Sequence, residues 1–136
     1  MVWALHFLFV FDLNKAVMRE RMKTVQVTVV AGAAGNLDAI EVDTFSNMDL
    51  VTGFYIPASD AFAPDVRMGL DDGTTTIHEK TNLRHYAASL ALPHDERFFP
   101  VNLVARGKVI RFPLERSGLL AADVTFDIVI RHEQNG

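Results

Sequence analysis

Hydrophobic and polar residues alternate along most of this chain with a period of two, which is typical of half-buried β-strands. The first run, TVQVTV at residues 24–29, sets valines against threonine and glutamine. The predicted strands cover residues 24–29, 40–42, 50–56, 66–70, 74–79, 97–105, 108–115 and 124–132. About eight short strands at this spacing predict a β-sandwich or a barrel.

Turn-forming residues separate these strands. Pro57 ends the third strand, and Asp71-Asp72-Gly73 predicts a tight hairpin turn because glycine accepts a positive φ. Residues 80–93 are less regular, and we expect a short strand or a helical turn within 83–92. No helical pattern is long enough for a βαβ crossover, so the sequence predicts an all-β, antiparallel fold. Strand count alone leaves a jelly roll, an immunoglobulin-like sandwich and a barrel open.

The segment before the first strand is different, because residues 2–11 (VWALHFLFVF) form an apolar run that only His6 interrupts. In a strand, alternate bulky side chains would share one face of this segment. These are Trp3, Leu5, Phe7, Phe9 and Phe11. Residues 12–21 have a better helical composition, so a short strand followed by a short helix agrees with both patterns. We therefore divide the chain into an N-terminal arm, residues 1–23, and a β-sandwich domain, residues 24–136.

Such an apolar arm is an aggregation site if it stays in water. The run is about half the length of a transmembrane helix, and the basic residues follow it, which is unlike a secretory signal. We expect neither a signal peptide nor a transmembrane helix. The arm would instead be buried in its own core, in a neighbouring subunit or at a lipid surface. A further alternative is that translation begins at Met22, which would remove most of the arm.

Charge is distributed unevenly between the two parts. Residues 1–23 contain four basic and two acidic residues, net +2, whereas residues 24–136 contain nine basic and fifteen acidic residues, net −6. The whole chain has a net charge of −4, which argues against a dedicated nucleic-acid binder. The absence of cysteine excludes disulfides, thiolate metal sites and cysteine nucleophiles within the 136 residues.

Three histidines, His78, His85 and His94, are the strongest candidates for a metal site. In cupin-type jelly rolls, two histidines stand one residue apart, and here Ile77-His78-Glu79-Lys80 has no second histidine at that spacing. Surface or hydrogen-bonded histidines are the simpler interpretation, so we expect no metal and no cofactor.

Other candidate groups also have simpler interpretations. Glu41 with Asp43 would lie on the solvent face of an alternating strand, and the Asp71–Asp72 pair belongs to a turn. Arg106, Lys108 and Arg111 form a small basic cluster near Phe98, Phe99 and Phe112, as a single-stranded nucleic-acid platform would. Aromatic residues in alternating strands mostly point into the core, however. We expect no catalytic residues and no nucleic-acid partner.

Eight short strands after a basic, apolar arm resemble the single jelly-roll proteins of icosahedral viruses and phages. The resemblance covers most of the chain, with the arm at residues 2–23 and the sandwich at 24–132, and it rests on organisation alone. It implies a jelly-roll-like sandwich whose arm reaches neighbouring subunits or an internal membrane. The acidic body departs from capsid proteins that package nucleic acid directly, and favours a minor, vertex or cementing component.

The sequence thus predicts a structural protein, and not an enzyme, that forms symmetric homo-oligomers or joins other structural subunits. Its location would be a virion or the cytoplasm, with the bulky face of the arm as the oligomer interface and with membrane contact as a further role of the arm. The first alternative is a sandwich that binds carbohydrate or peptide through a loop containing Tyr55 and Phe62 and through the turn at Asp71–Gly73. The second alternative is a cupin-like metal-dependent enzyme.

Overall fold

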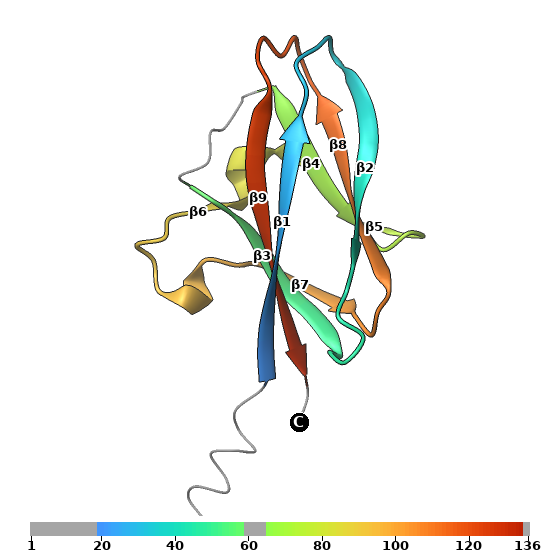
Figure 1. Cartoon of the computed structure of the whole chain (residues 1–136), viewed down its shortest axis with the longest axis vertical. Coiled ribbons are helices and arrows are strands. Elements are labelled where there is room, and N and C mark those ends of the chain that lie inside the picture. Colours follow the sequence, from blue (N-terminus) through green and yellow to red (C-terminus); the bar gives the residue numbers. More distant parts are fainter. Residues whose placement is uncertain (1–18, 59–64, 135–136) are drawn as a thin grey trace, which may run out of the picture.

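The computed structural model describes residues 19–58 and 65–134, which form two β-sheets packed face to face (Figure 1). The first sheet has the order β1 (Arg19–Val29), β9 (Val124–Gln134), β3 (Leu50–Pro57), with β7 (Phe99–Val104) and β6 (Ala87–Ala88) beside β3. The second has the order β2 (Gly35–Asp43), β8 (Val109–Arg116), β4 (Val66–Asp71), β5 (Thr76–Asn82). Two short 3-10 turns, η1 (Leu83–Tyr86) and η2 (His94–Glu96), lie between β5 and β7.

The pairing of the strands defines a jelly roll. β1 pairs with β9, β2 with β8, β3 with β7 and β4 with β5, all antiparallel. These four pairs follow one another along a single long antiparallel hairpin. The hairpin is folded so that the first and third pairs lie in one sheet and the second and fourth pairs lie in the other. This arrangement is the eight-stranded jelly roll. The prediction of an all-β, jelly-roll-like sandwich is confirmed, with the two-residue β6 as an additional strand in the irregular stretch.

The core lies between the sheets and follows the predicted alternation. Every second residue of β9, from Val124 to Ile130, is buried, and the intervening residues are exposed or half-buried. Phe54 of β3 and Phe112 of β8 meet across the core with ring centroids 5.3 Å apart and edge-to-face geometry. Burial of each such side chain stabilises the fold by roughly 1.5–3 kcal/mol. The inward positions are therefore filled by side chains of the described strands themselves.

A second, smaller cluster covers the outer face of the first sheet. The segment that connects β6 to β7 returns across this face, and it places Phe98 over Gly53 and against Tyr55, whose ring centroid is 5.0 Å away. The Arg131 guanidinium lies over the Phe98 ring, 4.4 Å from its centroid. Gly53 is required here because a Cβ at this position would lie 2.7 Å from the Phe98 Cβ.

The start of β1 differs from the predicted domain boundary. β1 begins at Arg19, so Arg19–Lys23, assigned above to the arm, pair with β9 in the sandwich. Met22 thus lies inside β1, opposite Arg131. The apolar run at residues 2–11 and its bulky face lie outside the described residues. No helix within residues 19–58 and 65–134 has the length and apolar character needed to cross a membrane.

Candidate assembly surfaces

The structure brings two of the three predicted histidines together. His78 on β5 and His85 on η1 stack with ring centroids 5.2 Å apart. His78 Nδ1 is 2.9 Å from the Tyr86 hydroxyl oxygen, and that hydroxyl also donates to the Met68 carbonyl at 2.8 Å. Burial raises the pKa of the Tyr86 hydroxyl, which keeps it protonated as a donor. With Phe99 of β7, whose ring contacts both histidines, this cluster bridges the two sheets.

The third histidine lies elsewhere. His94 of η2 reaches β1, where its Nε2 is 2.6 Å from a carboxylate oxygen of Glu20. With Asp95, these residues place three ligand-type atoms within 4.8 Å of one another, and all three residues are exposed. His and carboxylate ligands of this kind suit a divalent cation, but the positive Arg131 guanidinium lies 4.0 Å from Asp95 and opposes one. The contact between His94 and Glu20 also anchors the β6–β7 connection to β1.

Three of the remaining candidates lie side by side, because Arg111 of β8 pairs with Glu41 of β2 on one side and with Asp71 of β4 on the other. Arg106 pairs with Asp49 at 3.5 Å and Arg111 with Glu41 at 3.9 Å. The Asp72 carboxylate accepts hydrogen bonds from the backbone N–H groups of Thr75 and Thr74. These bonds, the Thr75 bond most of all, lower the pKa of Asp72. The hydrogen bonds of Asp72 are those expected of an aspartate in a turn.

The predicted ligand loop is only partly within the structure. Tyr55 is buried beneath Phe98 on the outer face of the first sheet. Phe62 lies outside the described residues. Ligand binding at this loop therefore stays a prediction.

A further buried histidine, His132, was not among the predicted site residues. It lies on β9, opposite Arg21 near the start of β1. His132 of β9 is fully buried and stacks on Phe45, with ring centroids 4.5 Å apart. Arg21 lies on the same phenylalanine, 4.0 Å from its centroid. Neither nitrogen of the His132 ring has a hydrogen-bond partner of good geometry among the described residues. The signal was present in the sequence, because position 132 continues the inward alternation of Ile128 and Ile130.

Desolvation lowers the pKa of His132, and the nearby charges of Lys23 and Arg21 lower it further. Backbone groups of Ile130 and Arg21 act in the opposite direction, more strongly than these charges but less strongly than desolvation, so the pKa is lowered on balance. The neutral imidazole is therefore the form that the folded protein favours.

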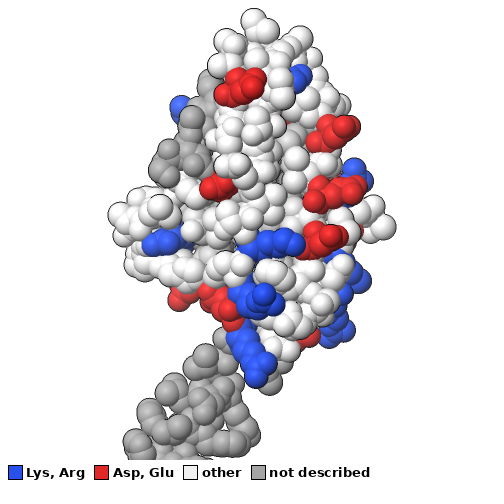
Figure 2. Space-filling view, in the orientation of Figure 1, with Lys and Arg blue, Asp and Glu red and all other residues white. Residues whose placement is uncertain are grey.

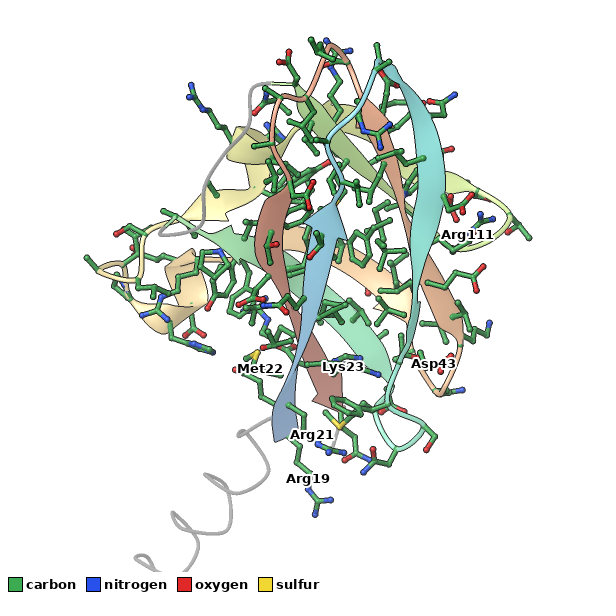
Figure 3. The ribbon with its side chains drawn as sticks, turned by 45° about the horizontal axis from the view of Figure 1, so that its top comes forward. Arg19, Arg21, Met22, Lys23, Asp43 and Arg111 are labelled. Carbon is green, nitrogen blue, oxygen red and sulfur yellow. The ribbon has the colours of Figure 1, made fainter. Side chains whose placement is uncertain are left out.

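Basic side chains gather around the start of β1. Arg19 and Arg21 lie near the first residues of this strand, at one end of the sandwich, and Lys23 points from it toward β2 (Figure 3). On the face shown in Figure 2, most of the Lys and Arg side chains lie in the half that contains this end. Arg21 donates to the Asn47 side chain at 3.2 Å, and Lys23 donates to the Asp43 carbonyl, so these cations also link β1 to β2 and to the connection that follows it.

The opposite lateral side of the sandwich contains a groove. It has a volume of about 420 Å³ and lies between the β4–β5 hairpin and the end of β7. Its walls contain Ile77, Leu103 and Val104, together with the polar Thr74 and Asn102 and the charged Asp72 and Lys108. Ile77 and Val104 are 39% and 48% exposed. A groove of this size is comparable to protein sites that take a ligand or a few side chains.

The molecule is thus a jelly-roll sandwich with one lateral side bridged by cations and the other hollowed by a groove. No family model and no curated protein matches the chain. A solved structure from work described as "Bacillus endospore appendages form a novel family of disulfide-linked pili" aligns over 88% of this chain and 93% of that one, with 15% identity and a TM-score of 0.36. A TM-score this low supports no conclusion about the present chain.

Proposed function

We propose that this protein is a structural subunit that assembles with copies of itself through the apolar segment at residues 2–11. The observation that carries the proposal is a core that the described strands already fill, combined with ten residues, VWALHFLFVF, that require burial. Since the inward positions of both sheets are occupied, the bulky side chains of this segment need another surface. A second copy of the chain supplies one without any further partner.

The jelly-roll strand order supports a more specific form of the proposal. Jelly rolls recur in viral capsid proteins, in lectins and in cupins. An apolar arm that joins the sandwich at one end of an edge strand fits the first of these uses, because it can extend to a neighbouring subunit. We therefore favour a minor, vertex or cementing component of a virion. The ligand-binding and metal-enzyme alternatives remain predictions from the sequence.

The test is removal of residues 2–18, which leaves β1 intact from Arg19. The proposal expects the full chain to be oligomeric and the truncated chain to be a folded monomer. Light scattering coupled to size exclusion measures the mass, and far-UV circular dichroism checks the fold. An oligomer of unchanged size after truncation would refute the assembly role of the arm.

A matched pair of substitutions tests whether the bulky face matters. Phe7→Asp places a charge on the face shared by the aromatic residues, whereas His6→Asp places the same charge on the opposite face of a strand. We expect the first substitution to dissociate the oligomer and the second to leave most of it assembled.

A further inference from the structure

Apart from the two-residue β6, the described sheets have four edge strands, and their charges differ. β1 contains Arg19, Glu20, Arg21 and Lys23; β2 contains three acidic residues; and β5 contains the Glu79–Lys80 pair. Charged side chains on an edge strand discourage the addition of another strand. β7 (FPVNLV) contains no charged residue, and within the described parts of the chain it pairs with β3 alone. β7 is therefore the edge that is least protected against strand addition.

The two lateral sides of the sandwich are also closed to different extents. Between β1 and β2, Lys23 donates to the Asp43 carbonyl at one end, and Arg116 Nε donates to the Val30 carbonyl at 2.9 Å near the other. Between β5 and β7, the His78–Tyr86 cluster closes the side only near the start of β7. The groove opens beside the end of β7, at Val104.

The geometry points to the free edge of β7 and the adjacent groove as the acceptor for residues 2–11 of a second copy, an inference that rests on the proposed function. The occupant is a ten-residue segment without Asp, Glu, Lys or Arg, and it is longer than the six-residue β7. Strand addition of this kind gains affinity from main-chain hydrogen bonds and specificity from alternate side chains that enter pockets. The exposed apolar residues of the groove, Ile77 and Val104, are suited to receive bulky side chains from one face of the arm, between the charged Asp72 and Lys108 that also line it.

The strand register explains why a second copy is favoured over the chain's own arm. Val104 pairs with Leu50, Leu50 with Glu133, and Glu133 with Glu20, so the end of β7 and the start of β1 lie in one row across the sheet. Three strand spacings separate them, and a strand added outside β7 would lie a fourth spacing away, about 19 Å from the start of β1. The seven residues 12–18 can span about 23 Å, so the arm could reach its own β7.

In that case, however, the arm would run toward the start of β1, in the same direction as β7. The pairing would be parallel, which is slightly less stable per residue than antiparallel pairing. An arm from a second copy has no such constraint and can add antiparallel. Reciprocal exchange of arms would close a two-fold dimer, and one-way exchange would form a ring or an open chain.

Cysteine cross-linking tests the acceptor directly, because the chain contains no native cysteine. A tagged chain carrying Leu5→Cys, Phe7→Cys or Phe9→Cys is mixed with an untagged chain carrying Val104→Cys, and the mixture is oxidised. The control replaces Val104→Cys with Leu119→Cys, which is more exposed (74% against 48%) but lies in the β8–β9 connection, at the opposite end of the sheets. We expect a disulfide-linked tagged–untagged dimer with Val104→Cys, at least tenfold more abundant than with Leu119→Cys.

A second measurement does not depend on disulfide geometry. Val104→Lys should weaken self-association by about tenfold or more, because it replaces an apolar contact with a charge, whereas Leu119→Lys should not change it. Both positions are exposed, so both variants are expected to fold, which circular dichroism checks.

The outcomes separate the acceptor from the proposed function. Equal cross-linking to both cysteines, or an intramolecular Phe7→Cys/Val104→Cys disulfide in place of the intermolecular one, overturns the assignment of β7 to a second copy. Either result leaves the arm as an assembly element if removal of residues 2–18 still dissociates the oligomer. If that removal leaves the oligomer intact, the proposed function itself fails.

Discussion

Replacing His132 by leucine should stabilise the protein. The imidazole is fully buried, and neither of its nitrogens has a partner of good geometry among the described residues. An unsatisfied buried polar group costs about 1–3 kcal/mol, and a leucine of similar size removes that cost while it keeps the contact with Phe45. At pH 7.5 we therefore expect the free energy of unfolding of His132→Leu to exceed that of the wild type by about 1–3 kcal/mol.

The same substitution should change the pH dependence of stability. Burial lowers the pKa of His132 in the folded state below its ordinary value of 6.5, so below pH 6.5 the unfolded chain binds a proton that the folded chain does not. Stability is fully present above pH 6.5 and is lost as the pH falls toward the folded pKa. The loss is at most about 1.4 kcal/mol per pH unit. The difference in free energy of unfolding between His132→Leu and the wild type should therefore grow by at most about 2 kcal/mol between pH 6.5 and 5.

Urea unfolding followed by circular dichroism at pH 7.5, 6.5, 5.8 and 5 measures both effects. The difference between variant and wild type isolates His132, because the other titrating groups are common to both chains. His132→Gln is the matched control: it removes the titration but keeps a buried polar group, so it should show the pH effect without the gain at pH 7.5. A difference for His132→Leu that is constant from pH 7.5 to 5 would refute the protonation argument.

Three further substitutions test the fold. Tyr86→Phe removes a hydroxyl that donates to the Met68 carbonyl at 2.8 Å, and it should lower the free energy of unfolding by about 1–2 kcal/mol in the same urea assay. Gly53→Ala places a Cβ against Phe98 and should lower it by about 1–3 kcal/mol; an unchanged melting temperature would contradict the packing of the β6–β7 connection. Asp72→Ala removes the acceptor of the β4–β5 turn, and amide hydrogen exchange should become faster in this hairpin and not in β9.

Alternation was sufficient to predict the strands of this fold, but not their partners. The inward and outward positions of β9 follow directly from its sequence. β1 and β9 pair along their whole length although about one hundred residues separate them, and nothing local specifies that pairing. The short strand or helical turn expected within residues 83–92 is present as η1 and β6. The partner of β6, the end of β3, could not be predicted, because two alanines have no period.

The histidines show the same limit for the candidate sites. His78, His85 and His94 are near in sequence, but the 3-10 turn at Leu83–Tyr86 directs the second onto the first, and the β6–β7 connection carries the third to Glu20. These contacts depend on how the chain crosses the sheets, which no local pattern records. His132, by contrast, could have been identified as buried from its phase in the alternation.

The charges on the edge strands indicate which edge can accept a strand from a second copy. A jelly roll must expose four edges, and here the charged ones, β1, β2 and β5, cannot accept a strand without desolvating those charges. Only β7 combines an uncharged sequence with a neighbouring groove, and Pro100 interrupts its hydrogen-bonding edge near the start of the strand, away from the groove at Val104. An added strand should therefore pair best at the Val104 end. Cross-linking efficiency in the arm series should accordingly be higher with Val104→Cys than with Pro100→Cys, and the reverse order would argue against strand addition at this edge.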